Sequence, residues 1–241
     1  MILLLAGTLE ARQIAWGLVD QGLPVEASMA GATRKPERLP LPTRIGGFGG
    51  EDGFRAYLAE KGVTKVLDAT HPFAAQITDR TARVCADLAL PYCQLLRPGW
   101  VPEKEDDWTF VDAPDAVAQH IPQHATVFLA TGRQTLAQFK GLRGRRVLAR
   151  IVDPPTAPFP FEGGEYVIAR PPFPLDREVD LFTQLGVTHL VAKNAGGPAG
   201  VAKLTAARQL GLPVIMINRP AMPAATRVST VQQALDWIKT A

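Results

Sequence analysis

Short apolar runs alternate with amphipathic stretches along nearly the whole chain. The first run, Met1 to Ala6, is unbroken, and Gly7 and a helix-like stretch follow it. Runs of this kind are typical of strands buried on both faces of a parallel sheet, and the stretches between them have the period of crossover helices. The pattern therefore predicts an α/β protein in which glycine and proline mark the ends of the elements.

The same pattern places the individual elements. In the first half we expect strands at Ile2–Leu5, Val25–Met29, Arg44–Ile45, Val66–Ala69 and Tyr92–Leu95, and helices at Glu10–Asp20, Asp52–Lys61 and Ala74–Leu88. In the second half we expect strands at Thr109–Val111, Thr126–Leu129, Arg146–Arg150, Tyr166–Ala169, Leu190–Ala192 and Val214–Ile217, and helices at Pro114–His120, Thr135–Phe139, Asp176–Leu185, Val201–Leu210 and Thr230–Lys239.

A segment unsuited to either element separates the halves. Its sequence is RPGWVP, from Arg97 to Pro102, and a run of charged residues follows it. We therefore expect two Rossmann-like, doubly wound domains with mainly parallel sheets and a cleft between them, comprising residues 1–97 and 98–241. The fragment GVTKVLDA at 62–69 is similar to GVTHLVAK at 186–193, which favours two related halves. Residues 153–160 are too proline-rich for a helix or central strand, which predicts an extended loop, either a flap or a connector.

Composition narrows the class of protein. The chain is 46% hydrophobic and 20% charged, as globular enzymes are, and its net charge is +3. This mild excess suits a polyanionic small molecule better than a nucleic acid. Cys85 and Cys93 lack CxxC spacing and nearby histidines, so neither a metal site nor a disulfide framework is predicted. No apolar run approaches the roughly 18 residues that span a bilayer, and none resembles a signal peptide, so we expect a cytoplasmic protein with no membrane partner.

The turn after the first strand is a candidate nucleotide site, because ligands of open parallel sheets bind at the carboxyl ends of the strands. It has one glycine where the dinucleotide fingerprint has three, but a tight turn and a helix N-terminus suffice to hold a pyrophosphate. Glu10 is expected to face a ribose hydroxyl or solvent, and a purely structural turn is the alternative. The candidate residues are Gly7, Thr8, Leu9, Glu10 and Ala11.

The end of the second strand predicts the choice of nucleotide. NAD enzymes place an acid there to bind the ribose 2′-hydroxyl, and Ala27 to Lys35 contains none. The hydroxyl, glycine and basic residues present suit a 2′-phosphate, which predicts NADP(H) over NAD(H); a solvated basic loop is the alternative. The candidate residues are Ser28, Gly31, Thr33 and Arg34.

Two further turns of the first half carry candidates. His71 precedes Pro72, which holds it extended at the end of a strand, where it could donate a proton, contact the nicotinamide or be structural. The glycine-rich turn around Gly49 offers backbone that can approach a ligand closely, or is merely flexible.

The second half has two turns that combine small residues with basic side chains. Thr131 and Arg133 follow one predicted strand, and Lys193 to Gly197 follow another, with Lys203 in the next helix. Two anion sites of this kind predict a ligand with several carboxylates or phosphates; unrelated surface charges are the alternative.

Taken together, these motifs resemble the precorrin-6A reductase family of cobalamin biosynthesis. The resemblance rests on AGTLEA at 6–11, DATHPFA at 68–74, LATG at 129–132, KNAGG at 193–197 and the late NRP at 218–220. It covers nearly the whole chain. The family pattern often has Gly-Gly-Thr and Lys-Asn-Ser-Gly-Gly where this chain has Ala6 and Ala195, and the second change removes a hydroxyl.

The resemblance implies NADPH-dependent reduction of a ring-D carbon–carbon double bond of precorrin-6A, giving precorrin-6B. It implies an NADP(H)-binding first domain, a second domain that binds the tetrapyrrole, and transient contact with neighbouring pathway enzymes as an option. His71 and Lys193 are the candidate proton donors, and bound water is an equal one. The candidate substrate ligands are Arg97, Thr131, Arg133, Lys193, Asn194, Gly196, Gly197 and Lys203.

Two other functions fit the residues alone. One is an NADP-dependent reductase of another polyanionic substrate, since the first half would serve either reaction. The other is a non-catalytic regulator that binds NADPH and uses its second domain to contact a protein partner. Turnover of a tetrapyrrole substrate would distinguish precorrin-6A reduction from both of these alternatives.

Overall fold

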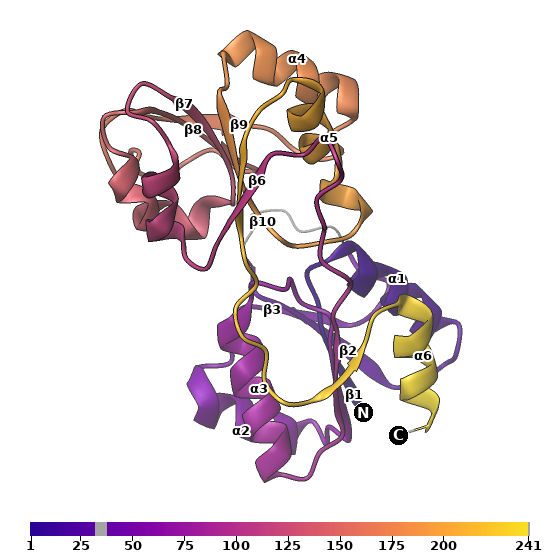
Figure 1. The fold of residues 1–241 in the computed structure, drawn as a ribbon. Coiled ribbons are helices and arrows are strands. Elements are labelled where there is room, and N and C mark those ends of the chain that lie inside the picture. Colours follow the sequence, from indigo (N-terminus) through magenta and orange to yellow (C-terminus); the bar gives the residue numbers. More distant parts are fainter. Residues whose placement is uncertain (32–37, 241) are drawn as a thin grey trace. The chain divides into compact units, whose positions relative to one another are not determined.

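The computed structural model describes residues 1–31 and 38–240 and divides into two α/β units (Figure 1). Unit 1 comprises Met1–Pro98 and Pro220–Ala241, and unit 2 comprises Gly99–Arg219. Each unit is built on one six-stranded sheet, and every strand pair in both sheets is parallel. Within the described residues, the predicted α/β architecture with parallel sheets is confirmed.

The elements of unit 1 alternate as expected. Its strands are β1 (Ile2–Leu5), β2 (Val25–Met29), β3 (Thr43–Ile45), β4 (Lys65–Asp68), β5 (Tyr92–Leu95) and β12 (Thr226–Val228). Its helices are α1 (Leu9–Val19), α2 (Gly50–Glu60), α3 (Ala75–Asp87) and α6 (Val231–Thr240).

Unit 2 contains more 3₁₀ structure. Its strands are β6 (Trp108–Val111), β7 (Thr126–Ala130), β8 (Arg146–Ile151), β9 (Gly164–Ile168), β10 (His189–Lys193) and β11 (Val214–Ile217). Its α-helices are α4 (Leu175–Leu185) and α5 (Ala202–Gln209), and its 3₁₀ helices are η1 (Pro114–His120), η2 (Arg133–Leu142) and η3 (Pro198–Gly200). The helices predicted at 114–120 and 135–139 are therefore 3₁₀ rather than α.

The two sheets share the order of five of their six strands. Sheet 1 runs β3-β2-β1-β4-β5-β12, and sheet 2 runs β9-β8-β7-β10-β11-β6. Sheet 1 therefore has the doubly wound order 3-2-1-4-5-6, with its switch point between β1 and β4. In sheet 2 the strands β7 to β11, counted from β7, follow the order 3-2-1-4-5 with the switch point between β7 and β10, and the sixth place is taken by β6, which precedes them in the chain. The similar fragments at 62–69 and 186–193 occupy the same place in this order, because each leads into the fourth strand. Gly62 and Gly186, with φ of +58° and +63°, end the preceding helices.

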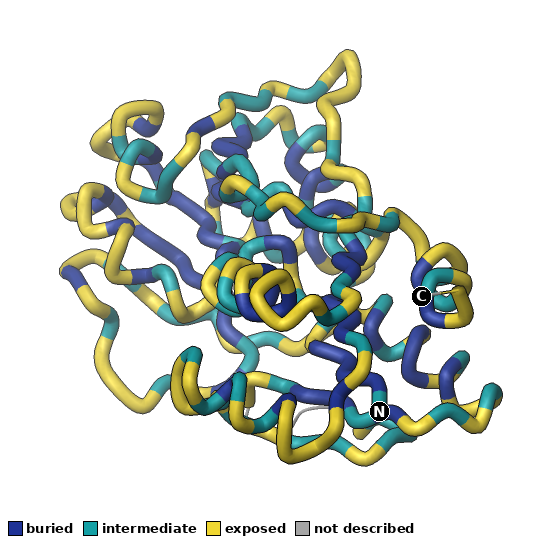
Figure 2. Tube along the Cα trace, turned by 90° about the horizontal axis from the view of Figure 1, so that it is seen from below, coloured by how far each residue is buried: buried dark blue, intermediate teal, exposed yellow. Residues whose placement is uncertain are grey.

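Unbroken apolar runs are explained by burial on both faces of each sheet (Figure 2). In β1, Leu4 packs with Ile14 and Leu18 of α1, whereas Leu3 packs on the opposite face with Phe54 of α2. All four residues of β1 are buried. A strand sandwiched in this way needs no polar alternation, which is why the first run is entirely apolar.

The C-terminal segment corrects the predicted domain composition. We expected residues 98–241 to form the second domain, but residues 220–241 belong to unit 1. There β12 pairs with β5, Thr226 opposite Cys93, and Ala234 and Ile238 of α6 are buried in the core that includes α1. The prediction was wrong because helix periodicity identifies α6 without identifying the sheet it covers, and β12 is too short and polar to be recognised. Residues 153–160 form neither helix nor strand, as expected.

Candidate functional site

The β1–α1 turn lies at the switch point of sheet 1 and is built around Gly7 and Thr8. Gly7 has φ +136°, and a Cβ added there would meet nothing within 4 Å. Thr8 caps α1: its Oγ1 accepts from the amide of Ala11 at 3.1 Å and donates to the carbonyl of Ala69 at 2.7 Å. The turn is thereby tied to the chain that leaves β4. Thr8 therefore shapes the turn, while the positive end of α1 lies at the carboxyl edge of the sheet.

Glu10, in the first turn of α1, forms an ion pair with Arg97. Arg97 Nη1 lies 2.8 Å from Glu10 Oε2, and both side chains are less than one-fifth exposed. We expected Glu10 to face a ribose or solvent, and its carboxylate instead bonds this guanidinium. The pair offsets a charge that would otherwise repel a phosphate near the helix N-terminus. It also places Arg97, a predicted substrate ligand, in unit 1.

The remaining members of this turn differ in exposure. Ala11 is fully buried in the core, whereas Leu9 is 40% exposed. Ala11 contributes its amide to the cap and its methyl group to packing. Neither side chain offers a polar group to a nucleotide.

Arg44, which was predicted only as part of a strand, bonds the carboxyl end of β2. Arg44 of β3 donates to Ser28 Oγ at 2.8 Å and to the carbonyls of Gly46 and Gly47 at 2.9 and 2.8 Å. Ser28 is buried and Gly31 has φ +73°. Thr33 and Arg34 lie outside the described residues, as does Lys35. The register of the two strands places Arg44 of β3 opposite Ser28 of β2, and this pairing was the signal that could have identified the contact.

The glycine-rich turn between β3 and α2 is open. Gly46 and Gly49 have φ of +118° and +79°, and Cβ atoms added at either would meet nothing within 4 Å. Gly49 is the N-cap of α2 and supplies no side chain to its first amides. The backbone of the turn is therefore not covered by neighbouring side chains at these two glycines.

His71 and Pro72 follow β4 in an ordered turn. His71 is exposed, and its Nδ1 accepts from the amide of Phe73 at 3.2 Å. An Nδ1 that accepts leaves the proton of the neutral ring on Nε2, which makes Nε2 a donor. Pro72 is buried. Just before them, the buried carboxylate of Asp68 accepts from Thr70, Thr78 and Tyr92 and joins β4, α3 and β5. Asp68 is not among the predicted site residues.

Two glycines at the switch point of sheet 2 adopt the same rare conformation. Gly132 has φ 77° and ψ 171°, and Gly197 has φ 78° and ψ 167°. This region is essentially restricted to glycine. Each residue is the N-cap of a 3₁₀ helix, and the two turns follow β7 and β10, which are neighbours in the sheet. Gly196 also has a positive φ, +69°.

The side chains at the end of β7 are Thr131 and Arg133. Thr131 is 7% exposed, and its buried Oγ1 has no hydrogen-bond partner among the described residues. Arg133 is exposed at the first position of η2. The predicted pair is therefore split into a buried hydroxyl and a solvent-facing cation.

The turn after β10 is held by Trp100. Asn194 accepts from the amide of Trp100 at 2.7 Å and donates to its carbonyl at 3.1 Å, and the indole donates to the carbonyl of Gly197 at 3.0 Å. Both polar atoms of the Asn194 side chain are thus engaged with backbone. Arg219 adds bonds to the carbonyls of Asn194 and Ala195. Trp100 and Arg219 therefore hold the KNAGG turn, and neither is among the predicted site residues.

The two lysines near this turn have lowered pKa values. Burial lowers the pKa of Lys193 at the end of β10. Lys203 donates to the carbonyl of Gly200 at 2.7 Å and lies 4.9 Å from the Trp100 ring centroid. Burial and the nearby Arg150 lower the pKa of Lys203 to about 8, against a smaller opposing effect of Glu178. Arg150 and Glu178 themselves form a buried ion pair of 2.7 Å.

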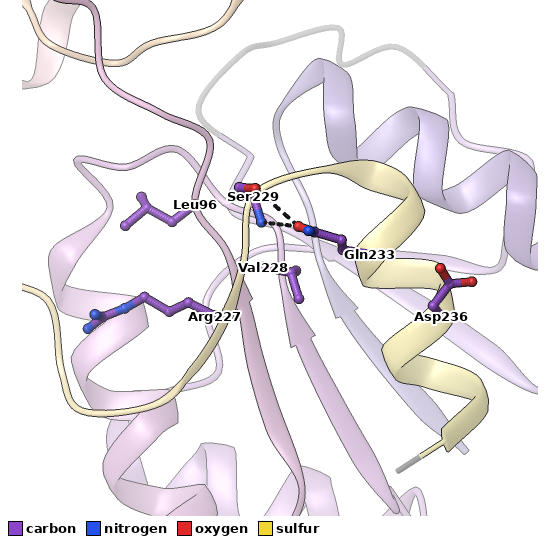
Figure 3. Close-up of a pocket in the computed structure, with 6 residues that line it drawn as sticks. All are labelled: Leu96, Arg227, Val228, Ser229, Gln233 and Asp236. Carbon is purple, nitrogen blue, oxygen red and sulfur yellow. Dashed lines mark hydrogen bonds between the residues drawn. The ribbon is translucent and has the colours of Figure 1, made fainter.

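A surface pocket of unit 1 is lined by none of the predicted site residues. It is lined by Leu96, Arg227, Val228, Ser229, Gln233 and Asp236 (Figure 3). Its amide and hydroxyl at Ser229 both donate to Gln233 Oε1, an arrangement that caps α6. In the described part of the chain no group of three His, Cys, Asp or Glu residues could hold a metal. Across those same residues, no helix is long and apolar enough to cross a membrane.

Known proteins match this chain over nearly its whole length. The family model for precorrin-6x reductase CbiJ/CobK matches residues 1–239. A precorrin-6A reductase of Rhodobacter capsulatus is 45% identical over 98% of this chain and 95% of its own, and one of Rhodococcus erythropolis is 42% identical over 99% and 97%. A cobalt-precorrin-6A reductase of Priestia megaterium is 29% identical over 98% and 96%.

A solved structure agrees with the fold. The structure described as CobK precorrin-6A reductase is 45% identical, covers 99% of this chain and 95% of its own, and superposes with a TM-score of 0.94. The resemblance carried by the sequence motifs is thereby confirmed. The chain belongs to the precorrin-6x reductase family, a family of oxidoreductases that use a nicotinamide cofactor.

Proposed function

We propose that this protein catalyses the NADPH-dependent reduction of a ring-D carbon–carbon double bond of precorrin-6A, giving precorrin-6B in cobalamin biosynthesis. The observation that carries the proposal is the family match over residues 1–239, with relatives named for this substrate at up to 45% identity. The free, buried cysteines Cys85 and Cys93 suit a reducing compartment, and we place the reaction in the cytoplasm.

Unit 1 is proposed to bind NADPH. Its sheet has the dinucleotide-binding order, and its switch point carries a tight glycine turn at the N-terminus of α1. The ion pair of Glu10 with Arg97 removes an exposed negative charge from that helix end. The open glycines of the β3–α2 turn give a nucleotide room to lie against backbone. These residues fit the cofactor.

Unit 2 is proposed to bind the carboxylates of the tetrapyrrole. Arg133 is exposed at one switch-point turn, and Lys193 and Lys203 lie at or after the other. Guanidinium and ammonium groups are the natural partners of carboxylates. Asn194, Gly196 and Gly197 would act mainly by holding the turn after β10 in place.

The cofactor supplies the hydride, so the protein must orient the two reactants, exclude water and provide a proton. His71 is one candidate, and it would donate its proton as an imidazolium; in the neutral ring its Nδ1 accepts from the amide of Phe73, a bond that protonation of Nδ1 would break. Lys193 is the other candidate, since burial makes its ammonium a stronger acid than an exposed lysine. Either would protonate the carbon next to the one that receives the hydride.

We further propose that the metal-free macrocycle is the preferred substrate. The relatives described above that are named precorrin-6A reductase are 42–45% identical to this chain, whereas the one named for the cobalt form is 29% identical. A kcat/KM at least as high for cobalt-precorrin-6A would contradict this preference.

The experiment that tests the function is turnover of purified protein with precorrin-6A and NADPH, followed by the absorbance of both compounds. We expect the two to be consumed in equal amounts. Arg133→Ala should raise the KM for the tetrapyrrole more than the KM for NADPH, and Gln134→Ala, at the exposed neighbouring position, is the control. The reverse KM pattern would contradict the assignment of the two units, and NADPH binding without turnover would favour a regulator.

A further inference from the structure

Arg44 lies at the carboxyl edge of sheet 1, where hydrogen bonds and an aromatic ring hold its guanidinium group. Its three bonds to Ser28 and to the carbonyls of Gly46 and Gly47 use three of the five N–H groups of a guanidinium. One face of the group packs on Phe48, with Cζ 4.0 Å from the ring centroid. The group is thus fixed in orientation and keeps two N–H donors that these bonds do not use.

The direct contacts of this cation are with a hydroxyl, carbonyls and aromatic rings. No acidic side chain of the described residues forms an ion pair with Arg44, and the ring of Phe48 has a second arginine beside it, Arg80 of α3, at 5.9 Å. Phe48 itself is held edge-on by Phe54 and Tyr57. Two guanidinium groups sharing one aromatic cluster give a local positive potential that favours an anion.

The position of Arg44 in the sheet indicates which anion. Arg44 is paired in register with Ser28, near the end of β2. In this sheet order the end of the second strand lies beside the adenosine ribose, and NADP enzymes place an arginine nearby for the 2′-phosphate. Because the Ser28 hydroxyl is bonded to Arg44, Ser28 would serve to orient the guanidinium and would leave the phosphate contact to it.

We propose that Arg44 binds the 2′-phosphate of the cofactor and is the residue within the described part of the chain that selects NADPH over NADH. This inference rests on the proposed function of unit 1 and adds to it a specificity-determining residue outside the predicted basic stretch at 33–35. A role confined to holding the glycine turn is the alternative. The two differ because only a phosphate contact discriminates between the nucleotides.

Calorimetric titration of the full chain with NADPH and with NADH separates them. The test variant is Arg44→Met, which keeps an apolar side chain against Phe48. The matched control is Arg80→Met, which removes a charge from the same aromatic cluster. We expect Arg44→Met to weaken NADPH binding by about tenfold to a hundredfold, as the loss of a charge-assisted hydrogen bond predicts, with NADH binding and the Arg80→Met variant little changed.

Other outcomes would overturn the inference in distinguishable ways. Equal weakening of NADPH and NADH would make Arg44 an anchor of the turn, and an equal loss of NADPH preference in Arg80→Met would indicate long-range charge instead of contact. If circular dichroism shows that Arg44→Met does not fold, Arg44→Lys becomes the test variant. We then expect a larger loss of affinity for NADPH than for NADH. A wild-type protein that binds both nucleotides equally refutes only the inference, whereas one that binds neither also refutes the proposed cofactor site.

Discussion

The hydroxyl of Thr8 donates to the carbonyl of Ala69 across the switch point of sheet 1, at 2.7 Å. In unit 2 the turn at the corresponding strand carries Thr131, whose buried hydroxyl has no partner among the described residues. The threonine of the turn after β1 therefore bonds across the switch point, whereas the threonine of the turn after β7 makes no such bond. This difference, together with the glycine conformations and the buried charges, leads to four predictions.

Replacing Thr8 by valine should destabilise unit 1 and weaken NADPH binding. The change removes both the cap of α1 and the bond to Ala69, and loss of a cap alone costs roughly 0.5–2 kcal/mol of unfolding free energy. Urea denaturation and NADPH titration would measure the two effects. Thr8→Ser keeps the hydroxyl and should behave almost as the wild type; equal damage in both variants would contradict a dominant contribution of the hydroxyl.

Gly132→Ala should be strongly unfavourable. Its φ and ψ of 77° and 171° are restricted to glycine, and forcing another residue there costs on the order of 1–3 kcal/mol. We expect a lower denaturation midpoint and a higher KM for the tetrapyrrole. Gly47→Ala is the control for stability, since φ of Gly47 is not positive and a Cβ there meets nothing within 4 Å. A Gly132→Ala protein as stable as Gly47→Ala would contradict the expected strain.

The pH dependence of stability should contain a contribution from Lys203. The pKa of Lys203 falls from 10.5 to about 8 in the folded protein, so the unfolded chain binds more protons between these values. Stability therefore gains a contribution as pH rises from 8 toward 10.5, and the full penalty is present below pH 8. Comparing urea midpoints of wild type and Lys203→Met across this range measures it.

The difference between these two proteins should shrink as pH rises. A difference independent of pH would mean that the lysine is not desolvated. If Lys203 also binds substrate as an ammonium, the KM for the tetrapyrrole rises above pH 8 while the KM for NADPH does not. Lys203→Arg, which stays charged, should lack that rise.

Glu178→Gln should destabilise unit 2 more than removal of the whole ion pair. Glu178 and Arg150 are buried, and taking away one charge leaves the other uncompensated at a cost of roughly 3–5 kcal/mol. The double variant Arg150→Met/Glu178→Leu should recover most of this loss. Denaturation of Arg150→Met, Glu178→Leu and the double variant completes a double-mutant cycle, and additive losses would show that the two residues are not coupled.

Local pattern was sufficient for much of this protein. The apolar run of β1, the glycine stops before β4 and β10, and the turn motifs that identify the family all depend on residues close together in the chain. A strand covered on both faces favours apolar residues throughout, and a turn with positive φ favours glycine, so both preferences are written in neighbouring residues.

Tertiary structure alone decided which distant segments meet. Helix periodicity identified α6 but could not tell that it covers α1 and that β12 pairs with β5, because many apolar faces are equivalent in sequence and only packing selects one. Side-chain partners were decided in the same way: Glu10 bonds Arg97, Asn194 bonds Trp100, and Arg44 bonds Ser28. These contacts join residues 16 to 94 positions apart, and no local period encodes them.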